Sequence, residues 1–470
     1  MKIKILKEKL SKSAANNMIR IKKHNNAELN KEPIIIGVTG SRGKSSVCYM
    51  LHNYLKNIGY KSILYSSIEI DSDLSYVKKH CAVDNPLKSK KNLLSAVDQC
   101  IKSNADFLIL EVNERAIDLG LIDDVEFDIK VLTNIIEKQN EVFYPNYVDI
   151  KKKFLKNSSK GEKQILVVKD NHCCDLIKEL ERENLRLITS PFLKQRFNFE
   201  TNNLDYIIGS VQGQFDSLSG VNFSIQQNNI LETVKSKLLF PYSIFNIACV
   251  FSILKELNLY KALEFQNLIN SIIIPGRDEV VKFKNRYIII SVNLVPQLEY
   301  LRKYIYNNKL LVVTGATGLG FSGWMNEFSN ELLQKDKNLS MSFAYNYIKN
   351  YADEVYITIS DIGSSKKDEL LNEQYKLVNN EIACYIVDNR KAAIKTAILN
   401  SKPNDVIFIS GRGNREILCD SINHISLLKD IDILNEIIYE IEGGELSWFF
   451  LLVYMMAKKY WMVLLQKLNI

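Results

Sequence analysis

A ten-residue segment near the start of the chain has the residue types of a phosphate-binding loop. Residues 37–46 read Gly-Val-Thr-Gly-Ser-Arg-Gly-Lys-Ser-Ser and follow an apolar run at 33–36. Glycines let backbone N–H groups turn toward phosphate oxygens, and a helix that begins near Ser45 directs its positive end to the same place. In such a loop Lys44 contacts the β- and γ-phosphates and the Ser45 hydroxyl binds Mg²⁺. The segment therefore predicts a nucleoside triphosphate site.

The alternative is an ordinary turn between a strand and a helix. The commonest form of the loop has Gly five residues before Gly43, where this chain has Val38. The phosphate-binding interpretation is favoured because an apolar strand precedes the loop and an amphipathic helix follows it. The apolar positions of that helix are Val47, Met50, Leu51, Tyr54, Leu55 and Ile58.

Two further positions carry groups that could take part in chemistry. Glu111 ends the apolar run 107–110, and ligands of open α/β sheets collect at the carboxyl ends of the strands. Glu111 is therefore a candidate Mg²⁺ ligand, with a solvated carboxylate as the alternative. The lysine run 151–153 predicts a charged helix face, unless one of its lysines points inward.

The order of segments predicts an α/β fold. Short apolar runs alternate with helical stretches, which is the pattern of a parallel sheet covered by helices. We expect strands at 61–66, 107–111, 129–132 and 164–168, and a second series at 287–290, 309–313, 354–359, 383–387 and 405–409. The expected domains are a basic leader (1–32), a central P-loop domain with a mainly parallel sheet (33–274), a Rossmann-like C-terminal α/β domain (275–442) and a hydrophobic tail (443–470).

Composition and charge indicate a globular protein of the cytoplasm. The chain has 470 residues, 46% hydrophobic and 24% charged. Residues 1–31 carry nine Lys or Arg against two Glu, which accounts for the net charge of +7. A solvated lead-in is favoured over a nucleic-acid or membrane contact, and no nucleic-acid partner is expected. The eight cysteines lack paired metal spacing, and the leader lacks the apolar core of a signal peptide.

The tail is unusually apolar. Residues 446–465 contain two of the three tryptophans, but Lys458 and Lys459 interrupt the apolar run short of the roughly 20 residues that a membrane span requires. An interfacial helix at a membrane surface, an oligomer contact and a translated frameshift extension remain open.

Several segments occur in the order seen in the Mur ligases, which this chain resembles over about residues 33–442. Besides the loop, they are Leu110-Glu111-Val112, Thr133-Asn134-Ile135, Tyr147 followed by Lys151, Phe245-Asn246, Pro275-Gly276-Arg277 and Gly411-Arg412-Gly413. Their collinearity makes the match specific, and residues 390–411 are similar to the muramyl-tripeptide synthetase branch. Mur ligases are ATP-dependent amide ligases of cell-wall assembly, with relatives that make folylpolyglutamate, cyanophycin and poly-γ-glutamate.

The resemblance implies ATP and Mg²⁺ as cofactors, with a small carboxylate and an amine as substrates. It implies that an acyl phosphate forms and that the C-terminal domain closes over the cleft. Lys44, Lys151 and Arg277 are the implied catalytic residues, and Ser45 and Glu111 the implied metal ligands, joined by Lys151 if it is carbamylated. The implied ATP contacts are Gly40, Ser41, Arg42, Gly43, Lys44, Ser45, Ser46, Asn246 and Arg277.

The chain also departs from the family pattern. Lys138 and Gln139 replace an Asp-His pair, and Cys249 replaces the second asparagine of the adenine segment. Residues 291–296, 361–364 and 411–415 differ from the family's nucleotide and diaminopimelate motifs. About 33 residues precede the loop strand, which are too few for a UDP-sugar-binding domain. The poly-γ-glutamate synthases also lack that domain, and Arg42 within the loop is similar to their sequences. A wall-type amino acid is therefore not the expected substrate.

Two functional hypotheses follow. The favoured one is an active ATP-dependent carboxylate–amine ligase with an unusual substrate. The alternative is a nucleotide-binding, catalytically weak Mur-like scaffold or partner subunit.

The glycine-rich segment 315–320 is interpreted as the glycine turn of the C-terminal domain, in preference to a second nucleotide site.

Overall fold

The protein is described by a computed structural model. The described residues are 33–71, 87, 89–136, 144–159, 161–180, 183–191, 193, 205–210, 218–227, 230–305, 307–315, 329–361, 365–378, 381–415, 417–421, 424–427 and 429–443. The leader, the tail beyond residue 443 and the predictions made for residues 138–139, 316–320 and 362–364 lie outside them.

The first sheet has ten strands in the order β10-β9-β8-β7-β6-β5-β1-β4-β2-β3. The run from β8 to β2 is parallel, and β3, β9 and β10 are antiparallel to their neighbours. The bounds are β1 Ile34–Thr39, β2 Ser62–Tyr65, β3 Ile70–Asp71, β4 Phe107–Glu111, β5 Ile129–Leu132, β6 Lys163–Val167, β7 Leu185–Thr189, β8 Tyr206–Ser210, β9 Val221–Gln227 and β10 Ile230–Ser236.

Helices cover both faces of this sheet, because alternate residues of each strand point to opposite sides. Ile36 and Val38 of β1 belong to one core, and Ile35 belongs to the other. The first core includes α2 (Lys44–Asn57), α8 (Tyr242–Glu256) and α9 (Ala262–Ser271). The second includes α3 (Lys90–Ser103), α4 (Glu114–Asp118), α5 (Tyr147–Lys156) and α6 (Asn171–Ile177). The apolar stripe predicted for the helix after the loop is confirmed, with Val47, Met50, Leu51, Tyr54 and Leu55 buried.

The second sheet has six strands in the order β11-β12-β16-β13-β14-β15, all parallel except β11. These strands are β11 Glu279–Phe283, β12 Arg286–Ser291, β13 Leu310–Thr314, β14 Glu354–Ile357, β15 Ala383–Ile386 and β16 Val406–Ser410. A separate hairpin pairs β17 (Ile417–Ser421) with β18 (His424–Leu427). The predicted α/β fold class, with two mainly parallel sheets, is confirmed.

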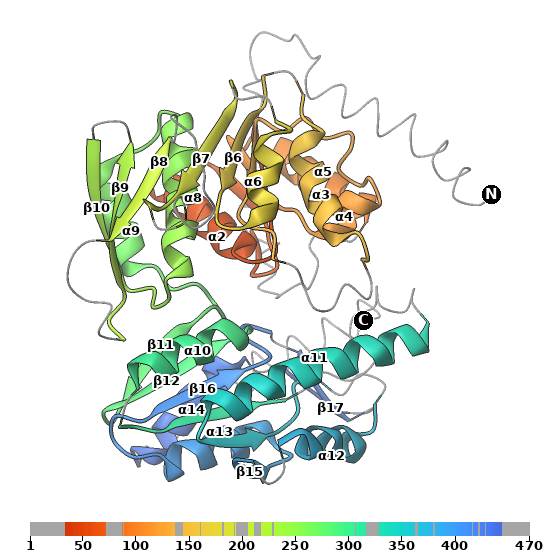
Figure 1. The fold of residues 1–470 in the computed structure, drawn as a ribbon, viewed down its shortest axis with the longest axis vertical. Helices are drawn as coiled ribbons and strands as arrows, with labels where there is room; N and C mark the ends of the chain where they lie inside the picture. The colour runs from red at the N-terminus through yellow and green to blue at the C-terminus, as the bar shows by residue number, and fades with distance from the viewer. Residues whose placement is uncertain are drawn as a thin grey trace.

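Two groups of helices pack on the second sheet. The core on one side of the sheet contains α10 (Val295–Tyr304), α11 (Asn330–Tyr351) and α12 (Lys367–Val378). The core on the other side contains α13 (Arg390–Asn400) and α14 (Asp430–Ile441). A buried ion pair ties α13 to α14, with Arg390 Nε 2.7 Å from Asp430 Oδ1 and Arg390 Nη2 2.8 Å from Asp430 Oδ2. Figure 1 shows the two sheets with their helices as two bodies, called here the first and the second body.

Specific contacts join the two bodies at the turn between α9 and β11. Gly276 has φ +65°, and a Cβ atom there would lie 2.2 Å from the backbone nitrogen of Asn414, so only glycine fits without displacement. The Asn414 side chain donates to the carbonyl oxygen of Ile68 in the first body at 2.9 Å. The second sheet is therefore linked to the β2–β3 turn of the first.

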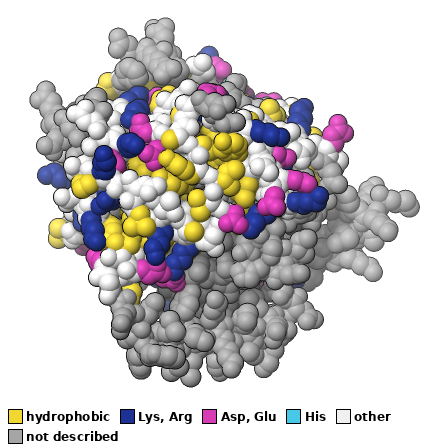
Figure 2. All heavy atoms as spheres, turned by 90° about the horizontal axis from the view of Figure 1, so that it is seen from below, with side chains coloured by type: hydrophobic (Ala, Val, Ile, Leu, Met, Phe, Trp, Pro, Cys, Tyr) yellow, Lys and Arg dark blue, Asp and Glu magenta, His cyan; other side chains and the backbone are white. Residues whose placement is uncertain are grey.

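The surface of the second body mixes apolar and charged side chains. Seen from below, apolar side chains lie in small groups among lysine, arginine and acidic side chains (Figure 2). On the edge strand β15, Tyr385 and Ile386 are exposed. Within the described residues, no helix is long and apolar enough to cross a membrane.

Candidate functional site

The predicted phosphate-binding loop connects β1 to α2, and its shape is fixed by the neighbouring chain. Gly43 has φ +87°, and a Cβ atom there would lie 2.3 Å from the Oδ1 atom of Asn246 on α8. The backbone nitrogen of Arg42 donates to Asn134 Oδ1 at 3.1 Å, and Asn134 Nδ2 donates back to the Arg42 carbonyl at 2.8 Å. Lys44 Nζ donates to the Gly40 carbonyl at 3.0 Å, so its ammonium group lies over the loop.

Glu111 lies beside the first turn of α2 and is only 5% exposed. Ser45 Oγ donates to Glu111 Oε1 at 3.0 Å, while Ser66 Oγ and the Ser67 backbone nitrogen donate to Oε2 at 2.8 and 2.7 Å. The two serines reach Glu111 because β2 is the neighbour of β4 in the sheet. A carboxylate and a hydroxyl group are the hard oxygen donors that Mg²⁺ prefers, so this donor set fits that ion.

Lys151 is the lysine of the 151–153 run that points inward, with its side chain fully buried. Its Nζ atom donates to Glu114 Oε2 at 3.0 Å and to Thr39 Oγ1 at 3.2 Å, and it lies 5.4 Å from the centroid of the Tyr147 ring. The Tyr147 hydroxyl donates to Ser41 Oγ at 2.9 Å. These contacts join α4 and α5 to the end of β1 and to the loop.

Arg277 connects this site to the second body. Its Nη2 atom donates to Ser67 Oγ at 3.4 Å, one residue from the Ser66 hydroxyl that contacts Glu111. Burial lowers the pKa of the Arg277 guanidinium, and the negative charge of Glu111 opposes that shift. Ser45, Glu111 and Arg277 therefore meet at the β2–β3 turn. Ser46 lies in the first turn of α2 and is half-buried.

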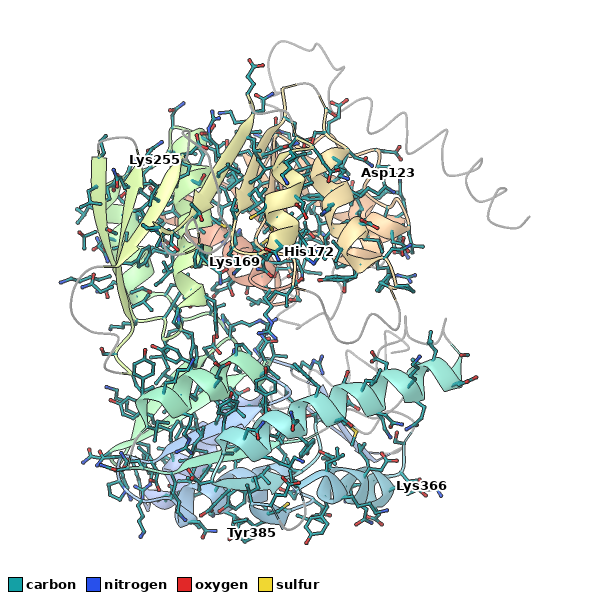
Figure 3. The ribbon with its side chains drawn as sticks, viewed as in Figure 1. Asp123, Lys169, His172, Lys255, Lys366 and Tyr385 are labelled. Atoms are coloured by element: carbon teal, nitrogen blue, oxygen red, sulfur yellow. The ribbon has the colours of Figure 1, made fainter. Side chains whose placement is uncertain are left out.

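Sequence reasoning did not identify three polar residues of this region. Ser66 and Ser67 have no local signal, because their role depends on β2 lying beside β4. Lys169 follows β6, and its Nζ atom lies 5.1 Å from the centroid of the Phe245 ring. Figure 3 labels Lys169 on the side of the first body that faces the second. Cys249, at the position of the missing asparagine, is fully buried on α8.

A group of metal-type donors lies behind the β2–β3 turn. Within the described part of the chain, His52, Glu69 and Asp71 place one ligand atom each within 4.8 Å of one another. Lys56 Nζ already lies 2.9 Å from Asp71 Oδ2, and His52 bridges Asp71 and the Ser62 hydroxyl. Because an ammonium group supplies the positive charge here, we assign this group to holding the turn in place.

Taken together, the geometry defines a class. The chain is an α/β protein whose glycine-rich loop, carboxylate and buried lysine meet at the carboxyl edge of a mainly parallel sheet, with an arginine from a second α/β body beside them.

Comparison with known proteins finds similarity to the Mur ligases. Residues 38–254 match the family model of the Mur ligase middle domain. The chain is 21% identical over 389 residues to a UDP-N-acetylmuramoyl-L-alanyl-D-glutamate--2,6-diaminopimelate ligase of Helicobacter pylori, a match that covers 82% of this chain and 79% of that protein. It is 23% identical over 421 residues to diaminopimelate ligase 1 of Clostridium acetobutylicum, covering 87% and 78%.

Solved structures agree. A UDP-N-acetylmuramoyl-L-alanyl-D-glutamate--2,6-diaminopimelate ligase matches with a TM-score of 0.56 at 16% identity, over 89% of this chain and 80% of that one. Escherichia coli FolC in complex with ADP matches with a TM-score of 0.56 at 17% identity, over 86% and 90%. The resemblance to the Mur ligases is therefore confirmed, with residues 38–254 similar to the Mur ligase middle domain.

Proposed function

We propose that the chain is an ATP-dependent amide ligase, which joins a carboxylate to an amine and releases ADP and phosphate. The observation that carries this proposal is the contact between Ser45 Oγ and Glu111 Oε1 at 3.0 Å, directly after the glycine-rich loop. It pairs a phosphate-binding loop with a metal-type carboxylate, which is the minimum that phosphoryl transfer needs. The related ligases named above support the reaction class.

In the first step, a carboxylate oxygen of the substrate attacks the γ-phosphorus of ATP. The bond from that phosphorus to the bridging oxygen breaks, and ADP leaves. Lys44, freed from the Gly40 carbonyl, would place its ammonium group against the β- and γ-phosphate oxygens. Arg277, beside Ser67, would neutralise charge from the side of the second body. Backbone N–H groups of residues 40–46 would hold the phosphates.

Ser45 and Glu111 are the residues that would hold Mg²⁺, whose charge offsets the charge that develops on the transferred phosphoryl group. Lys151 is proposed to be carbamylated in the active protein, because an anion next to Glu114 would form a second site for a divalent cation. Without the modification, its ammonium group is already satisfied by Glu114 and Thr39.

In the second step, the amine attacks the acyl carbon of the acyl phosphate. The bond to the phosphate oxygen breaks, phosphate leaves, and the amine gives up a proton to yield the amide. We propose that residues 33–274 and 275–442 act as two domains that close around this step and exclude water. Arg277 and Asn414 would link the two domains during this closure, because both already contact the β2–β3 turn.

The substrate is proposed to differ from a wall-type peptide, because the positions of the family's diaminopimelate motifs hold other residues. The test is a panel of amino acids, short peptides and dicarboxylic acids, each with ATP and Mg²⁺, with ADP release as the readout. Release that depends on one class of carboxylate, and is absent from Lys44→Ala, supports the ligase. ATP binding without release for any carboxylate would favour a scaffold.

A further inference from the structure

Lys169 is a half-buried cation that the reaction described above does not use. Its Nζ atom lies 5.1 Å from the centroid of the Phe245 ring. Among the described residues, no carboxylate forms an ion pair with it. The nearest acidic side chain in the sequence, Asp170, is occupied as the cap of α6, accepting from the backbone nitrogens of Cys173 at 2.8 Å and Ile135 at 3.0 Å. Burial lowers the pKa of Lys169, and the charge of Arg42 adds to that effect.

Such an arrangement is costly without a ligand. A desolvated ammonium group needs hydrogen-bond acceptors, and an aromatic ring face meets only part of that need. The chain keeps Lys169 at the carboxyl edge of the sheet, where ligands of open α/β sheets bind. A ligand with acceptor atoms would complete its surroundings.

The order of the strands indicates which part of a nucleotide lies there. Glu111 ends β4 on one side of β1, so the metal and the γ-phosphate belong to that side of the loop. β5 and then β6 lie on the other side, and Lys169 follows β6. On that same side, Asn246 touches the loop, since its Oδ1 atom lies 2.3 Å from the position of a Gly43 Cβ atom. The nucleoside end must extend toward Asn246 and Phe245.

We propose that Lys169 is a nucleotide-base contact, which donates a hydrogen bond to an acceptor atom of a purine lying near Phe245 and Asn246. This inference rests on the proposed function, because it requires a nucleotide in the loop. A purine offers ring nitrogens, and in guanine a carbonyl oxygen, as acceptors for an ammonium group. Phe245 supplies an apolar surface beside the same group.

The competing assignment is a phosphate contact, because Arg42 and Lys169 together could attract an anion. Inorganic tripolyphosphate separates the two, since it carries the phosphates of ATP and no base. We would measure the affinities of ATP, GTP and tripolyphosphate by calorimetry for the wild type and for Lys169→Met. The expected result is a loss of about tenfold or more for both purine nucleotides, the value of one hydrogen bond to a charged donor, and no change for tripolyphosphate.

Lys255→Met is the matched control, because Lys255 Nζ also lies over aromatic rings, 4.9 Å from the Phe251 centroid. Figure 3 shows Lys255 far from Lys169 on the first body. It is expected to leave all three affinities unchanged, and Lys169→Arg to restore part of the purine affinity. Equal losses for tripolyphosphate, or no loss at all, would overturn the inference and leave the ligase proposal standing. Failure of the wild type to bind any nucleotide would overturn both.

Discussion

Ser45 Oγ donates a hydrogen bond to Glu111 Oε1 at 3.0 Å, which joins the first turn of α2 to the end of β4. The two residues are 66 positions apart in the chain. They meet because β1 and β4 are parallel neighbours, so the loop after β1 and the last residue of β4 reach the same edge. Most of the predictions below concern this edge or the junction of the two bodies.

Glu111→Gln tests the metal-binding role of the carboxylate. The amide keeps the shape of the side chain and one acceptor oxygen, but it loses the negative charge and the hydrogen bonds that the second carboxylate oxygen accepts. We expect the Mg²⁺ concentration for half-maximal ADP release to rise by at least about tenfold. The change is measured by titrating Mg²⁺ at saturating ATP. An unchanged Mg²⁺ dependence would remove Glu111 from the metal site.

Gly43→Ala tests the shape of the loop, with Gly59→Ala as its matched control. Both glycines have positive φ, +87° and +96°, so both substitutions carry a backbone cost of about 1–2 kcal/mol. Only at position 43 would the new Cβ atom meet another side chain, that of Asn246. We therefore expect Gly43→Ala alone to abolish nucleotide binding in calorimetry. Similar binding by both variants would show that the Gly43–Asn246 contact does not shape the site.

Lys151 is predicted to carry a carbamate in the active protein. With ¹³C-labelled bicarbonate, NMR should show one carbamate carbon signal in the wild type and none in Lys151→Met, and the variant should lose ADP release. Lys152→Met is the control, because that neighbouring lysine is not fully buried and its Nζ atom lies 4.0 Å from Glu179 Oε1. An active wild type without the signal would assign Lys151 to its ammonium form, paired with Glu114.

Asp278 is predicted to make stability fall as pH rises. Burial raises the pKa of this carboxyl group above its usual value, although hydrogen bonds from Tyr242 and Gln297 oppose the shift. Between the unfolded and the raised folded pKa, the folded state binds more protons than the unfolded state, so the free energy of unfolding decreases with pH. Asp278→Asn should remove this slope in urea unfolding followed from pH 4 to 8.

Asp388 provides the opposite case when the same unfolding series is extended down to pH 2, because its effect on stability changes only below the ordinary carboxyl pKa. A hydrogen bond from Lys367 lowers the pKa of Asp388, so its stabilising effect is present above the unfolded pKa and is lost as pH falls through the folded one. Asp388→Asn should therefore change the slope in the other direction. If both substitutions changed the pH dependence of the unfolding free energy in the same direction, the raised pKa assigned to Asp278 would be contradicted.

The sequence predicted most of the parallel strands, because their apolar runs are continuous and well separated. The strands expected at 107–111 and 129–132 are found at those residues, and the bounds of the others differ by one or two positions. The strand β8 and the antiparallel strands β9 and β10 were not predicted. The edge strand β10 alternates exposed and buried residues, which gives it no strong apolar run.

The candidate site was only partly predictable. Lys44, Ser45 and Glu111 follow from motifs, since loop and strand end are local features. Ser66 and Ser67 required the strand order, because only that order places the β2–β3 turn beside Glu111. Lys169 could be identified only once the structure showed that the neighbouring carboxylate, Asp170, already accepts hydrogen bonds from Cys173 and Ile135. Such relations are set by packing and leave no mark in local sequence.

The most direct test of the central claim is to trap the acyl phosphate. The protein is mixed with ATP, Mg²⁺, hydroxylamine and each carboxylate of the panel, and the hydroxamate is measured together with ADP. The account predicts hydroxamate in proportion to ADP for one class of carboxylate, and neither product with Lys44→Ala. ADP release without hydroxamate for any carboxylate, with ATP bound, would contradict an amide ligase that works through an acyl phosphate.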